Sequence, residues 1–233
     1  MRILAFETSA KAGSVALVED GKLLAESYQN TGLTHSQTIM PMAEQLLQNC
    51  GYTVKDLDAV AVAAGPGSFT GVRIGVAAAK GLAWGAEIPC YGVSTLEAMA
   101  SNLGIDNGIV LPVMDARRNQ VYNAVFRADN GILSRVKEDR AISLEDLSKE
   151  LQGITGPIFL VGDGSTLCYN TLKETVPALV LPAEHRMHQR AAGVGLVAAE
   201  MIARGETGDG ATLQPNYLRL SQAERERLAR EQN

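Results

Sequence analysis

A glycine-rich turn between two apolar segments holds the residues best suited to bind a ligand. Residues 59–64 form a short uncharged apolar run, typical of a buried strand, and Gly65-Pro66-Gly67-Ser68 interrupts it. Ser68 is a suitable N-cap for a helix over residues 69–85. A strand, a glycine turn and a helix N-terminus together make a generic anion site. The alternative is a tight turn with a purely structural role.

Neither of the two common nucleotide-binding templates fits this turn. A P-loop requires Lys-Ser or Lys-Thr after its last glycine, whereas Val72 and Arg73 follow Gly71. A dinucleotide fingerprint requires G-x-G-x-x-G, and Thr70 stands where its last glycine should be. The candidate nucleotide or phosphate contacts at this turn are therefore generic ones, namely Gly65, Gly67 and Ser68.

Two carboxylates, Glu7 and Asp115, each end an apolar run that is typical of a strand. They could hold Mg²⁺ between them, as carboxylates do in sugar kinases. Alternatively, each accepts hydrogen bonds from the backbone of its own turn, as short acidic side chains readily do. Four further candidate contacts lie in neighbouring turns, where a purely structural strand-to-helix turn is the alternative: Thr8, Ser9, Gly162 and Gly164.

The remaining reactive side chains predict no catalytic residue and no metal site. The chain has three histidines, His35, His185 and His188. None of them is paired at i, i+4 on a helix, and the last two are better explained as solvated side chains of a loop. The three cysteines, Cys50, Cys90 and Cys168, stand in apolar segments and are expected to be buried free thiols. Spacing assembles no Ser/His/Asp or Cys/His arrangement.

The elements that position these residues follow an order that occurs twice. The first half predicts strands at 3–6, 14–19, 22–28, 59–64 and 90–93, with helices at 34–49, 69–85 and 94–102. The second half predicts strands at 109–114, 120–128, 132–136 and 158–161, with helices at 144–151, 166–174, 190–204 and 221–232. Pro41 is expected to kink the first helix or to mark its true start.

Two such halves facing each other predict an α/β protein with a duplicated actin/hexokinase/Hsp70-like (ASKHA) fold, in which two mixed-sheet lobes surround a cleft. We expect residues 1–106 to form the first lobe. Residues 107–233 are expected to form the second lobe, ending in a charged helix.

Charge and hydropathy limit the classes of function. The formal net charge is −5 and the pI is near 5.3, which argues against independent binding of a nucleic-acid backbone by this chain. The acidic residue Glu7 ends the apolar run at the N-terminus, so this segment is predicted to be a strand and not a signal peptide. No apolar run approaches the ~20 residues of a membrane span. A cytoplasmic protein is expected.

The helix over residues 69–85 has only Arg73 and Lys80 as charges, and its small residues recur every fourth position in two stripes. These stripes are Gly71, Gly75, Ala79 and Ala83, and Ala77, Gly81 and Gly85. One stripe suits the chain's own sheet, and the other requires a second helix, such as one from another protein. We expect this helix and the helix from Thr34 to present one face to a partner, formed by Ile39, Met42, Leu46, Val76, Ala79, Lys80 and Ala83. Glutamate at Val76 or Ala83 is then predicted to abolish association and leave the monomer folded.

Several motifs together resemble the bacterial TsaB family, formerly called YeaZ. They are GPGSFTGVRIG at the glycine turn, the opening ETS followed by SVAL, Thr34-His35-Ser36, Asp115-Ala116-Arg117-Arg118, Val121-Tyr122 and Pro215-Asn216-Tyr217-Leu218-Arg219. The resemblance spans nearly the whole chain. It implies a role in making threonylcarbamoyladenosine at the transfer RNA adenosine beside the anticodon.

The resemblance also implies partners. In this pathway TsaD, a related subunit, transfers the threonylcarbamoyl group from its adenylate to adenosine, and TsaB is its non-catalytic partner. The predicted helix face would pair with TsaD as a four-helix bundle, and with itself as a homodimer when TsaD is absent. A TsaE-like ATPase joins the pair, and transfer RNA is reached only through the complex.

The catalytic relatives carry a metal-binding H-x-x-x-H, and Thr95 and Met99 stand at the corresponding positions here. Hydroxyl and thioether are poor replacements for imidazole at such a metal. The family usually has Asp at the position of Glu7. We therefore expect no intrinsic cofactor, a weak contact with ATP or ADP at most, and an accessory subunit more than an enzyme. An autonomous ATP-dependent phosphotransferase of the same fold and a glycoprotease-like (M22) hydrolase stay open as alternatives.

Overall fold

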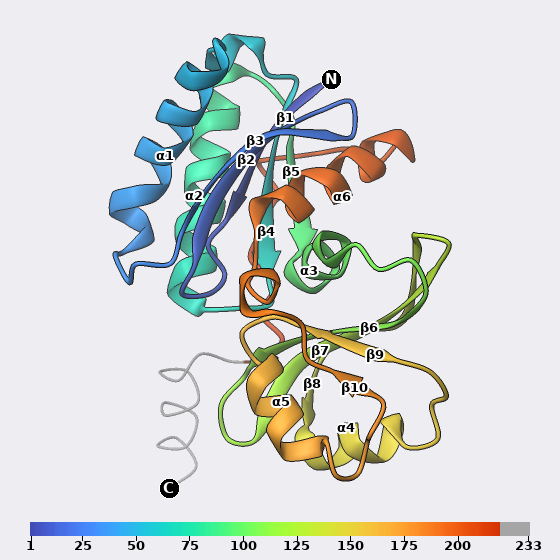
Figure 1. Cartoon of the computed structure of the whole chain (residues 1–233). Helices are drawn as coiled ribbons and strands as arrows, with labels where there is room; N and C mark the ends of the chain where they lie inside the picture. The colour runs from blue at the N-terminus through green and yellow to red at the C-terminus, as the bar shows by residue number, and fades with distance from the viewer. Residues whose placement is uncertain (220–233) are drawn as a thin grey trace, which may run out of the picture.

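The computed structural model describes residues 1–219, which form two lobes built on two five-stranded mixed sheets (Figure 1). The first sheet has the order β3-β2-β1-β4-β5 and contains β1 (Arg2–Glu7), β2 (Gly13–Glu19), β3 (Lys22–Gln29), β4 (Ala59–Gly65) and β5 (Cys90–Ser94). The second has the order β8-β7-β6-β9-β10 and contains β6 (Gly108–Asp115), β7 (Gln120–Asp129), β8 (Ile132–Ser143), β9 (Ile158–Val161) and β10 (Leu179–Val180).

The two sheets have the same topology. In each, the first three strands are antiparallel neighbours, and the first strand pairs in parallel with the fourth, which pairs in parallel with the fifth. The predicted duplicated fold is therefore confirmed. The sequence did not predict β10, and β8 is longer than its prediction.

The helices are α1 (His35–Cys50), α2 (Phe69–Ala86), α3 (Thr95–Leu103), α4 (Leu144–Leu151), α5 (Ser165–Leu172) and α6 (Ala191–Ala203), with short 3₁₀ turns η1 (Val54–Asp56) and η2 (Glu184–Arg186). Helix α1 runs through Pro41, which is not its start, and the Thr34 side chain makes no capping hydrogen bond. Ser68 does cap α2, because its side chain accepts the Gly71 N–H. The helix predicted at 221–232 lies outside the described residues.

Alternation along β1 sends side chains to both faces of the first sheet. Leu4 and Phe6 pack against α1 and α2, whereas Ile3 and Ala5 pack against α6. Helix α6 thus covers the face opposite α1 and α2, as Figure 1 shows. The prediction assigned residues 107–233 to the second lobe, but α6 returns to the first lobe, because a helix of mostly Ala, Gly and Val fits closely against the small residues of this sheet face.

The second sheet is covered by α4 and α5 on one face, around Leu111 and Val113. Its other face packs against α3 through residues such as Val110 and Phe126. Helix α3 follows a strand of the first lobe and lies on the sheet of the second, so it joins the two lobes.

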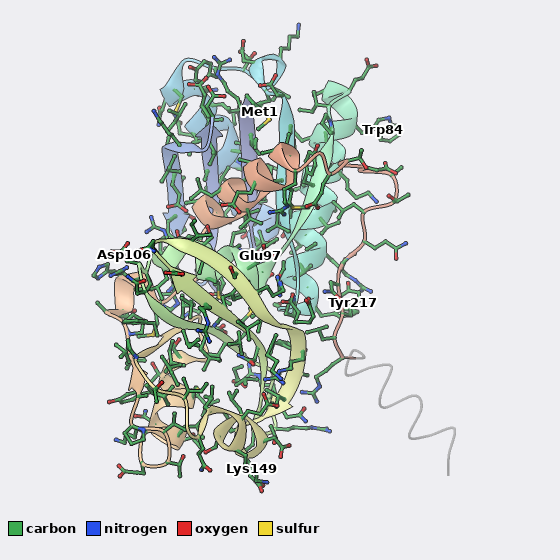
Figure 2. The ribbon with its side chains drawn as sticks, turned by 90° about the vertical axis from the view of Figure 1, so that its right-hand side faces the viewer. Met1, Trp84, Glu97, Asp106, Lys149 and Tyr217 are labelled. Atoms are coloured by element: carbon green, nitrogen blue, oxygen red, sulfur yellow. The ribbon has the colours of Figure 1, made fainter. Side chains whose placement is uncertain are left out.

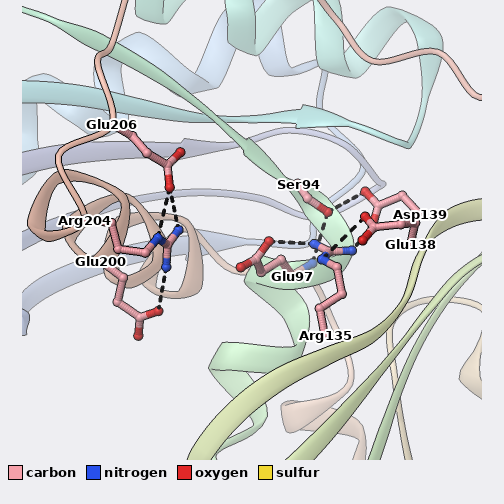
Figure 3. Close-up of polar contacts among 8 residues, drawn as sticks. All are labelled: Ser94, Glu97, Arg135, Glu138, Asp139, Glu200, Arg204 and Glu206. Carbon is pink, nitrogen blue, oxygen red and sulfur yellow. Dashed lines mark hydrogen bonds and ion pairs between the residues drawn. The ribbon is translucent and has the colours of Figure 1, made fainter.

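A cluster of charged side chains also joins the lobes (Figure 3). Arg135 of β8 donates to Asp139 Oδ1 and to Glu97 Oε2 of α3, both at 2.6 Å. Ser94, at the N-terminus of α3, donates to Asp139 Oδ2 at 2.6 Å and accepts the Glu97 N–H at 3.2 Å. Strand β8 is thereby tied to the start of α3.

After α6 the chain runs back along α2 toward the cleft; we call residues 206–219 the strap (Figure 2). The Lys80 ammonium donates to the Leu213 carbonyl at 2.9 Å, and the Asn216 N–H donates to the Ala64 carbonyl at 2.6 Å. The strap therefore lies against the glycine turn. Across residues 1–219, we find no helix that is both long and apolar enough to span a membrane.

Candidate functional site

A cleft of about 580 Å³ opens between the lobes, at the ends of β1, β4 and β6. Its walls come from the turns that follow these strands and from the end of the strap. The lining residues are Ser9, Ala10, Lys11, Pro66, Gly67, Ser68, Phe69, Met114, Asp115, Ala116, Arg117, Tyr122, Asp163, Asn216, Tyr217, Leu218 and Arg219. Of the predicted contacts, Ser9, Gly67, Ser68 and Asp115 thus meet at one cavity.

Glu7 lies beneath this cleft and is fully buried. Its Oε1 accepts the Ser9 N–H at 2.6 Å, and its Oε2 has no hydrogen-bond partner among the described residues. Burial raises the pKa of Glu7 to about 7, and the charge of Asp163 adds to the rise. Near neutral pH this carboxyl is therefore partly protonated, which weakens it as a ligand for a cation.

Asp115 caps its own turn in the same way, because its Oδ1 accepts the Arg117 N–H at 2.7 Å. Both carboxylates thus make the hydrogen bonds of the turn-capping alternative. Within residues 1–219, no three His, Cys, Asp or Glu side chains are grouped so as to hold a metal ion.

Asp163, in the turn after β9, is a further carboxyl at this site. It accepts a hydrogen bond from Gln189 Nε2 at 2.7 Å, and desolvation raises its pKa, with Asp115 adding to the effect. The sequence pattern indicated only the glycines on either side of Asp163 as candidate contacts. Asp163 follows β9, the strand that occupies in the second sheet the place of β4 in the first. This equivalence with the glycine turn was the signal that could have identified Asp163 as a site residue.

The glycines of the turn between β4 and α2 make room for other parts of this chain. A Cβ atom at Gly65, where φ is +117°, would lie 2.5 Å from the Asn216 carbonyl oxygen, and one at Gly67 would lie 2.6 Å from the Ser9 carbonyl oxygen. Thr8 does not line the cleft. Its hydroxyl donates to the Gly71 carbonyl at 2.8 Å and so fixes α2 to the turn after β1.

The turn after β9 is equally tight. A Cβ atom at Gly162 would overlap the Val113 carbonyl, and the Gly164 N–H donates to that same carbonyl at 3.1 Å. Neither glycine lines the cleft. The close approach of β6 therefore accounts for both.

The turn between β6 and β7 has an unusual backbone. Arg117, Arg118 and Asn119 have φ of +65°, +57° and +54°, a left-handed conformation that costs a non-glycine residue roughly 1–2 kcal/mol. The side chains of both arginines are exposed, and Arg117 lines the cleft. No glycine marks this turn, so the sequence pattern did not indicate its conformation.

Aromatic rings stand at the opposite edge. Tyr217 stacks on Phe69 with ring centroids 4.5 Å apart, and the Arg73 guanidinium lies 3.8 Å from the Phe69 centroid. Arg73 Nε also donates to the Tyr217 hydroxyl at 2.8 Å. This cluster fixes the end of the strap on the first turn of α2.

The predicted partner face is wrong for six of its seven residues, because they face the chain's own core. Ile39, Met42, Leu46, Val76, Ala79 and Ala83 are all buried between α1, α2 and the sheet. Lys80 is half-buried and holds the strap. The stripe that begins at Gly71 and Gly75 packs so closely that a Cβ atom at either glycine would overlap Thr8. The glutamate substitutions predicted at Val76 and Ala83 would thus disrupt folding.

The other small-residue stripe of α2 is exposed, as an interface with a second helix requires. Ala77, Gly81 and Gly85 lie on the outside, and a Cβ atom at either glycine would meet nothing within 4 Å. Trp84 is 86% exposed on this face and points away from the ribbon (Figure 2). Beside the stripe, an apolar groove of about 590 Å³ separates α1 from α2 and includes Met40 and Leu82.

The other predicted positions carry no evident chemistry in the structure. Thr95 and Met99, at the positions of the histidine pair, are both buried on α3. His35 contacts the Ala10 carbonyl at 2.8 Å, in keeping with its predicted place at a helix start. His188 lies 3.5 Å from Glu184.

Comparison with known proteins identifies relatives along nearly the whole chain. The family model described as "TsaD: tRNA N6-adenosine threonylcarbamoyltransferase" matches residues 28–227. The chain is 35% identical to the tRNA threonylcarbamoyladenosine biosynthesis protein TsaB of Bacillus subtilis (strain 168), covering 96% of each chain. It is 38% identical to the TsaB protein of Escherichia coli (strain K12), covering 94% of this chain and 95% of that one.

Solved structures agree with this. YeaZ from Pseudomonas aeruginosa superposes with a TM-score of 0.77 at 28% identity, covering 93% of this chain and 99% of that chain. A more distant neighbour is the activator of the 2-hydroxyisocaproyl-CoA dehydratase from Clostridium difficile, solved with bound ADPNP, with a TM-score of 0.51 at 12% identity over 88% of this chain and 97% of that one. That likeness concerns the fold alone.

Proposed function

Since the chain belongs to the TsaB (YeaZ) family, we propose that it serves threonylcarbamoyladenosine synthesis in transfer RNA as the non-catalytic partner of a TsaD-like subunit. The observation that carries the partner role is the exposed small-residue stripe of α2, at Ala77, Gly81 and Gly85. A stripe of this kind lets a second helix approach closely. A Trp beside it supplies a large apolar side chain of the type enriched at interfaces.

The same face forms a homodimer when the partner is absent, and a TsaE-like ATPase joins the heterodimer. The groove between α1 and α2 extends the apolar surface beyond the stripe, so that one partner contacts both helices. Lys80 turns away from this face to the strap, which leaves the stripe itself without a charge.

A non-catalytic role agrees with the side chains on α3 and at the glycine turn. A threonine and a methionine, Thr95 and Met99, occupy the positions of the histidine pair of the catalytic relatives, and both are buried. ATP or ADP makes only a weak contact in this proposal, because Ser9 and Asn216 fill the space next to the turn glycines through which phosphate groups would approach the backbone.

Size-exclusion chromatography with light scattering tests the proposal. The purified chain alone should give the mass of a dimer, and an equimolar mixture with the TsaD-like protein of the same organism should give a one-to-one heterodimer. Gly81→Glu places an unpaired charge in the interface, a cost of roughly 3 kcal/mol or more, so both associations should weaken at least about 100-fold.

Ala203→Glu is the matched control, since it also adds glutamate at an exposed small residue of a helix. It should leave both masses unchanged. A chain that stays monomeric and ignores the TsaD-like protein contradicts the proposal. ATP turnover by the isolated chain would favour a phosphotransferase instead, and peptide cleavage that chelators inhibit would favour a glycoprotease-like hydrolase.

A further inference from the structure

A row of arginines crosses the mouth of the cleft from one lobe to the other. It consists of Arg73 on α2, Arg219 at the end of the strap and Arg117 on the β6–β7 turn, and the exposed Arg118 follows Arg117 on that turn. We propose that this arginine row binds the phosphate backbone of an RNA directly. The inference rests on the proposed function, and the RNA is then the transfer RNA that is modified.

Hydrogen bonds make the row continuous. Arg73 Nε donates to the Tyr217 hydroxyl at 2.8 Å, and two residues later Arg219 donates to the Ala116 carbonyl. The next residue is Arg117. Three segments that are far apart in the sequence are thereby held side by side, with a guanidinium at each step.

Local charge along the row is opposite to that of the whole chain, whose formal net charge is −5. The cleft wall adds one further cation, Lys11, and one further carboxyl, Asp163, so the cations stay in excess, and α2 contains no acidic residue. Asp115 lies 3.6 Å from Arg117, but it already accepts a backbone N–H, and the Arg117 side chain is 85% exposed. This arrangement favours a polyanion at the cleft mouth.

The left-handed turn adds an argument about stability. Three consecutive non-glycine residues in this conformation together cost a few kcal/mol, and the surrounding structure has to maintain them. Asp115 accepts the Arg117 N–H, and the Asn119 carbonyl accepts the Leu144 N–H at 3.0 Å. The fold thus holds two solvent-exposed arginines in a strained position in which they make little packing contribution. Such an arrangement is expected where the side chains bind something outside the chain.

Tyr217 supplies a second kind of contact. The residue is 39% exposed, although Phe69 and Arg73 fix the position of its ring. An aromatic ring beside a line of cations is the arrangement by which proteins bind RNA strands without reading their sequence. A free nucleotide fits less well, because its phosphates would sit at the glycine turn, where Ser9 and Asn216 already fill the space.

The test is fluorescence anisotropy with a labelled, unmodified transfer RNA transcript and the full-length chain, over a series of salt concentrations from 50 mM upward. Wild type should bind with a Kd of about 10⁻⁴ M or tighter at the lowest salt concentration, as electrostatic binding does. Arg117→Gln/Arg118→Gln should weaken binding, and it should lower the slope of log Kd against log salt by about 1.4–1.8, the loss of two phosphate contacts. Arg127→Gln/Lys173→Gln is the matched control for charge and should bind as wild type does.

Three results would overturn the proposal: no RNA binding by wild type at 50 mM salt, an unchanged slope in the double arginine variant, or an equal loss in the control. Chromatography with the TsaD-like protein separates this proposal from the proposed function. The arginine variant should form the heterodimer normally, whereas Gly81→Glu should lose the heterodimer and keep the RNA affinity of the isolated chain.

Discussion

Replacing Glu7 by glutamine should remove a large part of the pH dependence of stability between pH 5 and 8. In the folded chain burial raises the pKa of Glu7 from its ordinary 4.5 to about 7. The folded state therefore binds protons that the unfolded state has already released in this range, and the free energy of unfolding falls as pH rises. Below about pH 4.5 the carboxyl is protonated in both states, so the effect is absent there.

The magnitude follows from the difference between the two pKa values. A difference of about 2.5 units at 1.36 kcal/mol each gives a loss of about 3 kcal/mol, complete above the folded pKa. Glutamine keeps an oxygen that can accept the Ser9 N–H, and it carries no charge at any pH. Desolvation also raises the pKa of Asp163, so a smaller slope of the same sign should remain in the variant.

Urea unfolding followed by far-ultraviolet circular dichroism, at intervals from pH 5 to pH 8, measures this. The stability of Glu7→Gln relative to wild type should increase by about 2.5 kcal/mol across this range, since part of the effect already occurs below pH 5. Glu44→Gln, which changes an exposed glutamate on α1, should show no such trend. If Glu7→Gln keeps the wild-type slope, then the buried carboxyl does not hold its proton near neutral pH, and the argument that it is a weakened cation ligand fails.

Two further substitutions test the packing of α2 and the contact between the lobes. Gly75→Ala should lower the melting temperature and destabilise the fold by roughly 1–3 kcal/mol, because its Cβ would overlap Thr8. Gly81→Ala adds a Cβ in open space, so it should raise the melting temperature and stabilise the fold by about 1 kcal/mol. A lower melting temperature for both variants would contradict the assignment of the two stripes. Arg135→Ala should cost roughly 1–3 kcal/mol in urea unfolding because it leaves Asp139, whose side chain is only 11% exposed, without its cation. The control is Arg127→Ala, at an exposed arginine of the adjacent strand β7, and it should change the free energy of unfolding by less than about 0.5 kcal/mol. If both variants lose the same stability, Arg135 does not stabilise the contact between the lobes.

The fold could be predicted from the hydrophobic periodicity of the sequence, because both halves of the chain repeat the same order of strands and helices. Alternating or continuous apolar runs indicated the strands, and Gly51 and Gly205 marked helix ends that the structure confirms with positive φ. What periodicity could not indicate was which sheet a helix covers. Helix α6 is apolar on nearly every side, so only the tertiary structure places it on the first lobe. The two-residue strand β10 is too short for any periodic pattern.

The sequence predicted the cleft better than the partner face. Residues at the ends of matched strands must meet where the sheets face each other, so Ser9, Gly67 and Asp115 could be placed there from their order alone. The two stripes of α2 are alike in composition, and the sequence does not specify which one the chain itself buries. Contact of Gly71 and Gly75 with Thr8 decides it, and that contact joins segments about sixty residues apart.

The three sides of α2 explain why a helix with two charges can leave one face to solvent. One side carries Gly71 and Gly75, which allow Thr8, in the turn after β1, to approach the helix closely. A second side carries both charges, and each is used to hold the strap: Lys80 through the Leu213 carbonyl and Arg73 through the Tyr217 hydroxyl. The third side carries neither charge, and its residues Ala77, Gly81 and Gly85 stay exposed, although strap residues 209–211 lie beside Gly81 and Trp84. Had either cation pointed along this side, a partner helix could bury it only at the cost of its hydration. Because the strap takes both, the remaining surface is apolar and uncharged, with small residues beside one large ring, Trp84, and such a surface suits the packing of a second helix.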